Sequence, residues 1–67
     1  MTKQEKEWLE RCKNEKDDFV IIVDNDCAYV VDLNDGDCGK CVFEFTHYGW
    51  KLALDLFLYL GCNAEEA

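Results

Sequence analysis

The middle of the chain holds three short runs of β-branched and aromatic residues, separated from one another by clusters of Asp, Asn and Gly. The runs are Phe19–Val23, Cys27–Leu33 and Lys40–Thr46. Short runs of this kind, bounded by turn-forming residues, indicate β-strands. Because the connections are too short for crossovers, we expect the three strands to pair as an antiparallel meander.

The segments on either side of these runs carry helical signals. Thr2 followed by Glu5 has the spacing of a capping box, which predicts a helix from about Thr2 to Lys16. Its polar face has opposite charges four residues apart, as in Arg11 and Glu15. Its apolar stripe is narrow and consists of Trp8, Leu9 and Cys12.

Thr46 is placed to cap a second helix from about His47 to Cys62, which Gly61 would end. This segment is apolar on nearly all sides, so we expect it in the core or in a subunit interface. Residues 63–67 are expected to form an acidic tail. At 67 residues the chain makes one domain, 1–67, with an α+β fold of helix, three-stranded antiparallel β-meander, helix.

The dipeptide Asp35-Gly36 predicts a two-residue type I′ turn, which fixes the pairing of the second and third strands. Val30 would then face Cys41, and Ala28 would face Phe43. The predicted core face contains Ala28, Val30, Cys41, Phe43 and Phe45. The opposite face contains Tyr29, Val31, Leu33 and Val42. That face is apolar for a surface left in water, so we expect a helix or a partner to cover it.

Charge is distributed unevenly along the chain. Fifteen acidic residues against seven basic ones give a net charge of −8. Residues 17–37 contain no Lys or Arg and seven of the acids, namely Asp17, Asp18, Asp24, Asp26, Asp32, Asp35 and Asp37. In the meander, Asp17, Asp18 and the Asp35 turn would fall near one end of the sheet, and Asp24 and Asp26 at the other.

An acidic protein is repelled by phosphate backbones, which argues against direct binding to nucleic acid or to an anionic membrane. Two interpretations of the Asp-rich segment remain open. Asp favours turns and improves solubility, and this alone accounts for its positions. Alternatively, the carboxylates imitate phosphates and occupy a basic groove on an enzyme that binds nucleic acid.

The five cysteines are expected to be free thiols in a reducing cytoplasm, because the start of the chain lacks the apolar stretch of a signal peptide. Cys38 and Cys41 have the spacing of a zinc knuckle. A zinc site would need two further ligands, and the candidates Cys12, Cys27, His47 and Cys62 show no paired spacing. Otherwise Cys41 is a buried small hydrophobe and Cys38 is partly exposed.

We expect neither catalysis nor a cofactor. The chain has no Ser, and its single histidine, His47, is predicted to lie on the surface of a helical first turn. No glycine-rich phosphate loop is present. Residues 32–37 depart from a calcium loop, which needs glycine at its sixth position and glutamate at its twelfth, because here glycine is fifth and Phe43 is twelfth.

The element order and the Asp-rich stretch from Asp17 to Asp37, followed by a strand and a helix, resemble small phage-encoded anti-CRISPR proteins. The similarity is architectural and is greatest to the short inhibitors of type II-A effectors. The chain differs from them in its five cysteines and in ending soon after the second helix. The resemblance implies a protein that binds the basic DNA-facing surface of an effector, where the protospacer-adjacent motif is read through arginines.

These observations predict a non-enzymatic, protein-binding inhibitor that acts as a DNA mimic through the seven Asp residues of segment 17–37. One alternative is a homodimeric structural or adaptor module. Its two-fold interface would be lined by Tyr29, Val31, Leu33, Trp50, Leu54 and Leu58. The other alternative is a small zinc-binding protein that uses Cys38 and Cys41.

Overall fold

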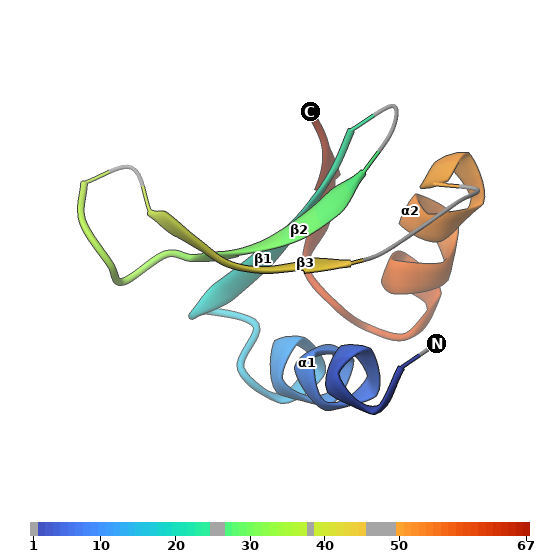
Figure 1. Ribbon diagram of the computed structural model, residues 1–67, viewed down its shortest axis with the longest axis horizontal. Coiled ribbons are helices and arrows are strands. Elements are labelled where there is room, and N and C mark those ends of the chain that lie inside the picture. Colours follow the sequence, from blue (N-terminus) through green and yellow to red (C-terminus); the bar gives the residue numbers. More distant parts are fainter. Residues whose placement is uncertain (1, 25–26, 38, 46–49) are drawn as a thin grey trace.

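The computed structural model describes residues 2–24, 27–37, 39–45 and 50–67, with side chains from residue 54 onward in the last range. The chain forms α1 (Lys3–Asn14), β1 (Phe19–Val23), β2 (Ala28–Asp32), β3 (Lys40–Phe45), α2 (Trp50–Tyr59) and β4 (Ala64–Glu66), as Figure 1 shows. The α+β class and the order of helix, antiparallel meander and helix are confirmed. The short strand β4 was not predicted from the sequence.

The four strands form one sheet in the order β3-β2-β1-β4, with β1 and β4 parallel. The backbone N–H of Ile21 donates to the Asn63 carbonyl at 2.8 Å, and the N–H of Ala67 donates to the Val23 carbonyl at 2.8 Å. The prediction of an acidic tail at residues 63–67 was therefore wrong. A segment this short, with two glutamates, has no strand signal of its own and forms a strand because it lies along the edge of β1.

Helix α1 begins with the predicted capping box. The Thr2 hydroxyl accepts from the Glu5 N–H at 3.1 Å, and the Glu5 carboxylate accepts from the Thr2 N–H at 2.7 Å. The helix ends at Asn14, two residues before the predicted end, because Glu15 leaves the helical conformation and acts as the C-cap.

Helix α2 ends in a Schellman motif centred on Gly61, which has a φ of 86°. The Gly61 N–H donates to the Leu58 carbonyl at 3.1 Å, and the Cys62 N–H donates to the Phe57 carbonyl at 3.0 Å. This pairing satisfies carbonyls at the helix end and requires a left-handed residue, which glycine supplies without strain. The motif reverses the chain toward β1 and so delivers β4 to the sheet. The proposed cap at Thr46 lies outside the described residues.

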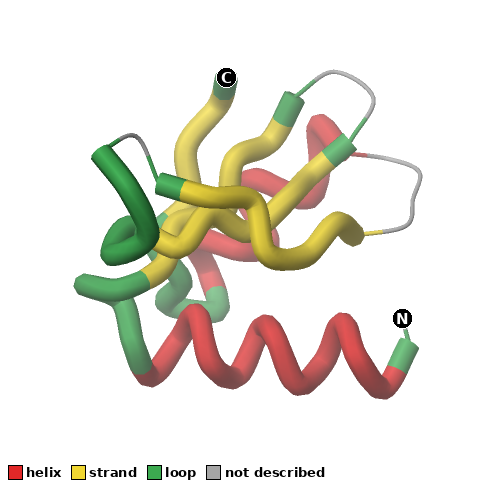
Figure 2. Tube along the Cα trace, turned by 60° about the vertical axis from the view of Figure 1, so that its left-hand side comes forward, coloured by secondary structure: helices red, strands yellow, loops and turns green. Residues whose placement is uncertain are grey.

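Both helices contribute to one hydrophobic core on a single face of the sheet (Figures 1 and 2). The buried members are Leu9, Cys12, Phe19, Ile21, Val23, Ala28, Val30, Phe45, Phe57 and Cys62. Aromatic contacts link the layers: Trp8 stacks on Phe43 with ring centroids 5.8 Å apart, and Phe45 contacts Phe57 at 5.3 Å. The core therefore connects each helix to the strands, as a small domain needs.

The pairing of β2 with β3 differs from the predicted register by two residues. Ala28 lies opposite Phe45 and Val30 opposite Phe43, and a bulge then places Cys41 opposite Val31. A shift of two residues keeps the same side chains on the same face, so the alternating pattern could not distinguish the two registers. In the predicted register Phe45 would lie opposite residue 26, beyond the end of β2. The observed register places it opposite Ala28, where its ring contacts Phe57.

The bulge also corrects two assignments of face. Cys41 is exposed, whereas the sequence predicted a buried side chain on the core face. Val42 packs against the core, although it was assigned to the opposite face. An extra residue in one strand changes the alternation beyond it, which explains both differences.

The predicted type I′ turn at Asp35-Gly36 is absent. Such a turn needs a positive φ at both central residues. Gly36 has a φ of 79°, but no described residue other than glycine has a positive φ, so Asp35 does not meet this requirement. A longer loop, residues 33–39, joins β2 to β3 and extends beyond the end of the sheet in Figure 1.

Candidate partner-binding surface

Five of the seven predicted aspartates lie at one end of the sheet. We call this group the acidic end; its members are Asp17, Asp18, Asp32, Asp35 and Asp37. Asp17 and Asp18 precede β1, whose first residue, Phe19, lies opposite Asp32 at the end of β2. Asp35 and Asp37 follow on the loop that leaves β2. The meander thus brings together acids that are far apart in sequence.

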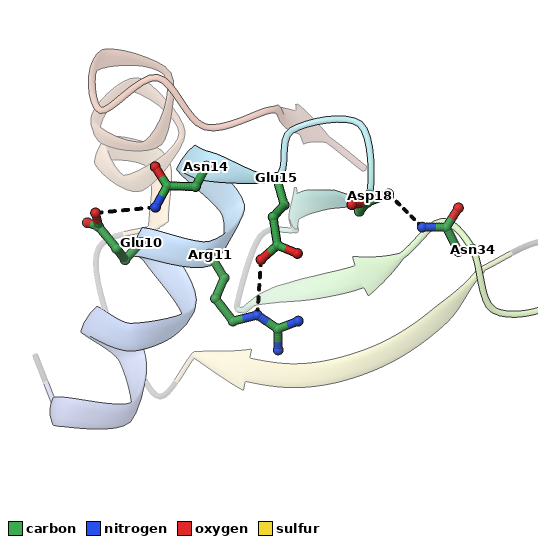
Figure 3. Close-up of polar contacts among 6 residues, drawn as sticks. All are labelled: Glu10, Arg11, Asn14, Glu15, Asp18 and Asn34. Carbon is green, nitrogen blue, oxygen red and sulfur yellow. Dashed lines mark hydrogen bonds and ion pairs between the residues drawn. The ribbon is translucent and has the colours of Figure 1, made fainter.

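Asn34 organises the centre of the acidic end. Its side-chain amide donates to Asp18 Oδ1 at 2.7 Å (Figure 3), and its backbone N–H donates to Asp32 Oδ1 at 2.9 Å. The backbone N–H of Leu33 also donates to the Asp18 carbonyl at 2.9 Å. These contacts fix the loop against β1. From the sequence Asn34 was predicted only to be a turn residue, although the Asp-x-Asn spacing was a signal for the local side-chain hydrogen bond.

The acidic end has little internal neutralisation. Within the described part of the chain, none of its five carboxylates forms an ion pair with Lys or Arg. Lys40 lies opposite Asp32 in the strand register, so one cation is close. Lys16 is directed elsewhere, since its Nζ lies 3.8 Å from the position that a Cβ would occupy at Gly61, beyond the C-terminus of α2.

The cation of Arg11 pairs with a glutamate of its own helix and packs on two aromatic rings. Arg11 Nε lies 3.3 Å from Glu15 Oε2 (Figure 3), which confirms that predicted helical pair. Its guanidinium carbon also lies 4.6 Å from the Trp8 ring centroid and 4.8 Å from that of Phe19. The guanidinium therefore lies beside Phe19, near the acidic end, but its ion pair is with Glu15 and not with an aspartate of that group.

A second group of acids lies at the opposite end of the sheet. Asp24 is exposed just after β1, where Val23 lies opposite Glu66 of β4. Glu65 and Glu66 are both exposed. These two glutamates could not be assigned to a surface from the sequence, because β4 has no strand signal of its own. Asp26, the remaining predicted aspartate, lies outside the described residues.

The four cysteines that the structure describes differ in exposure. Cys41 is exposed and its thiol lies 3.9 Å from the Phe43 carbonyl, whereas Cys12 and Cys62 are buried free thiols. Cys38 lies outside the described residues, so the Cys38–Cys41 zinc pair stays a prediction. Among the residues that the structure describes, no group of three or more His, Cys, Asp or Glu side chains is arranged to hold a metal ion.

The buried thiols are poor nucleophiles. Burial raises the pKa of Cys12 from 9.0 to about 12, and the neighbouring Cys62 thiol adds to the increase. Burial also raises the pKa of Cys62, against the opposing effect of Lys13 and Lys16. Because the thiolate is the reactive form, both groups stay protonated and inert at neutral pH. Their chemistry is that of small core residues.

Of the residues proposed for a two-fold interface, the five whose side chains the structure describes lie on different surfaces. Leu54 packs against the core, and Leu58 is 52% exposed on α2. Tyr29 and Val31 lie on the opposite face of the sheet, because their neighbours Ala28 and Val30 point into the core. The side chain of Trp50 lies outside the described residues, and Leu33 is exposed at the start of the loop.

Helix α2 is less buried than its composition predicted. Leu56, Leu58 and Tyr59 are 42%, 52% and 87% exposed. Among the described side chains from residue 54 onward, Leu54, Phe57 and Leu60 pack on the core. The spacing of apolar residues could not predict which side of α2 is exposed, because apolar residues occur on nearly all sides of the helix.

Neither of the described helices has the length and apolar character needed to cross a membrane. In three comparisons with known proteins, the chain matches no model of a protein family, no curated protein and no solved structure.

Proposed function

We propose that this chain is a non-enzymatic, protein-binding inhibitor that acts in the cytoplasm, where its acidic end enters a basic nucleic-acid-binding groove of a partner protein. One observation carries the proposal: five carboxylates gather at one end of the sheet without an ion pair among the described residues. The resemblance noted from the sequence suggests a type II-A CRISPR effector as the partner and a phage as the source of the chain.

The charge density supports mimicry of a nucleic acid. Neighbouring strands lie about 4.8 Å apart, so β1, β2 and β3 span roughly 10 Å. Duplex DNA carries about six phosphate charges over the same axial length. Five carboxylates on this width are therefore of the same order. Their mutual repulsion is a cost to the folded state, which a basic groove would relieve on binding.

A charge-matched pair of variants tests the proposal. The first is the triple variant Asp17→Asn, Asp35→Asn, Asp37→Asn, which changes exposed residues of the acidic end. The control is Glu7→Gln, Glu10→Gln, Asp55→Asn, which removes the same charge from exposed positions on the helices. At about 1 kcal/mol per lost contact, the first variant should bind roughly 100-fold more weakly, and the control should bind nearly as well as the parent chain.

Two measurements test separately which class of protein is the partner and whether the acidic end is the binding surface. Inhibition of DNA cleavage by a purified type II-A effector with its guide RNA tests the partner class. Pull-downs from host lysate at about 50 and 200 mM salt test the surface, since electrostatic binding weakens steeply with salt. Binding that ignores salt, or an equal loss in the control variant, would contradict the proposal.

A further inference from the structure

The face of the sheet that points away from both helices is apolar at its centre. We call it the open face; its central residues are Val20, Ile22, Tyr29 and Val31. Val20 lies opposite Val31, and Ile22 lies opposite Tyr29, so the four side chains form one patch on β1 and β2. None of them belongs to the core cluster or packs against it. Val20 is buried, with 5% of its surface exposed, whereas Ile22, Tyr29 and Val31 are half-buried. No described helix lies over this face of β1 and β2 (Figure 2).

A solvated sheet face normally carries polar residues in alternation with the core positions. Here both central strands place only apolar side chains on it, in five-residue strands whose other face already supplies the core. The β2–β3 loop approaches one corner of the patch, where a Cβ at Gly39 would lie 2.6 Å from Val31 Cγ1. Solubility alone does not account for the apolar surface that Ile22, Tyr29 and Val31 still leave partly accessible. The patch therefore has the character of an interaction surface.

Carboxylates stand at both margins of the open face. Glu44 of β3 lies opposite Tyr29, and Glu65 of β4 lies opposite Ile22, so a single row runs Glu44, Tyr29, Ile22, Glu65 across all four strands. Both glutamates are exposed. With three strand spacings of about 4.8 Å, their backbones are roughly 14 Å apart. No described Lys or Arg occupies this row.

We infer that the open face binds an amphipathic basic helix of a partner protein. A helix with its side chains is about 10–12 Å wide, so it fits between the two glutamates when it lies along the strands. Its apolar stripe would cover Ile22 and Tyr29. Lys or Arg on its flanks would reach Glu44 on one side and Glu65 on the other, while their aliphatic stems extend the apolar contact.

The negative charge of the open face and of the whole chain favours a basic helix over a second copy of the chain or an anionic membrane. A second copy of the chain would place glutamates against glutamates, and each copy carries a net charge of −8. An anionic membrane surface is repelled for the same reason. A basic helix is attracted by both margins. This binding uses none of the seven aspartates, so it goes beyond the proposed function and can fail or succeed independently of it.

The test uses a synthetic peptide of about 18 residues, long enough to form a helix, with a Leu stripe flanked by Lys. One control peptide has the same composition in scrambled order, and another has Glu in place of Lys. Titration into the isotopically labelled protein, followed by amide NMR shifts, locates the contact. We expect shifts on β1 and β2 with the Lys peptide, and none of comparable size with either control peptide.

Variants of the protein make the assignment specific. Ile22→Thr with Tyr29→Thr should weaken binding at least 10-fold, and Glu44→Gln with Glu65→Gln should reduce both affinity and its dependence on salt. Tyr59→Thr, on the exposed side of α2, is the matched control and should bind normally. The glutamate variants stay informative if the apolar variants unfold, because they alter only exposed carboxylates.

Three results would overturn the inference: shifts that map to α2, equal binding of the scrambled peptide, or unchanged affinity in the glutamate variants. The triple aspartate variant described above should still bind the peptide. If it does, while it no longer binds the protein partner, the two surfaces are separate. If the peptide fails to bind the parent chain, the inference falls and the proposed function is unaffected.

Discussion

Gly39 and Gly36 offer a controlled test of how tightly the β2–β3 loop is held against the sheet. Both glycines have nearly the same left-handed backbone, with φ values of 80° and 79°. A Cβ at Gly36 would meet no atom within 4 Å. A Cβ at Gly39 would lie 2.6 Å from Val31 Cγ1 and 3.1 Å from the Asp32 carbonyl oxygen. Alanine at the two sites therefore differs only in steric contact.

The magnitudes follow from these distances. Left-handed backbone costs an alanine about 1–2 kcal/mol, and the lower entropy of the unfolded chain returns roughly 0.4–1, so Gly36→Ala should destabilise the fold by about 1 kcal/mol. Gly39→Ala adds overpacking of about 1–3 kcal/mol, for a total of about 2–4. Neither neighbour can move easily, because valine is stiff at χ1 and the Asp32 carbonyl belongs to a paired strand.

Urea unfolding followed by tryptophan fluorescence measures both free energies under the same conditions. The melting temperature should fall by roughly 4–8 °C for each kcal/mol in a domain of this size. The difference between the variants is the decisive quantity, since the backbone term cancels. Equal losses of stability in the two variants would refute the close approach of Gly39 to β2.

Two further predictions concern the buried thiols and β4. Because the pKa of Cys12 is about 12 in the folded chain and 9.0 otherwise, the folded state binds more protons between these values. Stability should therefore be complete below pH 9 and fall as the pH rises toward 12, as urea unfolding at successive pH values will show. Deleting residues 64–67 should cost about 2 kcal/mol, because the β1 edge loses its pairing with β4, the hydrogen bond from the Ala67 N–H to the Val23 carbonyl and the packing of Ala64.

The prediction for Cys12 and the prediction for β4 each have a control variant. Cys27→Ala changes an exposed thiol and should leave the alkaline decline unchanged, whereas Cys12→Ala should flatten it. A decline that is equally steep without Cys12 would contradict the assignment. For β4, Glu65→Gln with Glu66→Gln keeps the strand and removes only charge, so the full loss of stability should appear in the deletion alone.

The local signals of the sequence were sufficient for most of the elements. The capping box at Thr2 and Glu5 and the helix stop at Gly61 both form as predicted, because each depends on hydrogen bonds within a few residues. The three strands of the meander were also predicted, since β-branched runs between turn formers leave few alternatives. The gathering of Asp18 and Asp32 at one end of the sheet follows from that order alone.

The sequence by itself thus determined the two helices, the three strands of the meander, the fold class and the uneven distribution of charge. Only the tertiary structure decided that residues 64–66 form a strand, that Phe45 rather than Phe43 lies opposite Ala28, and that Cys41 is exposed. These features depend on contacts between segments distant along the chain, and the local pattern is the same for either outcome. For that reason the open face, with Glu44 and Glu65 at its margins, became visible only when all four strands were in place.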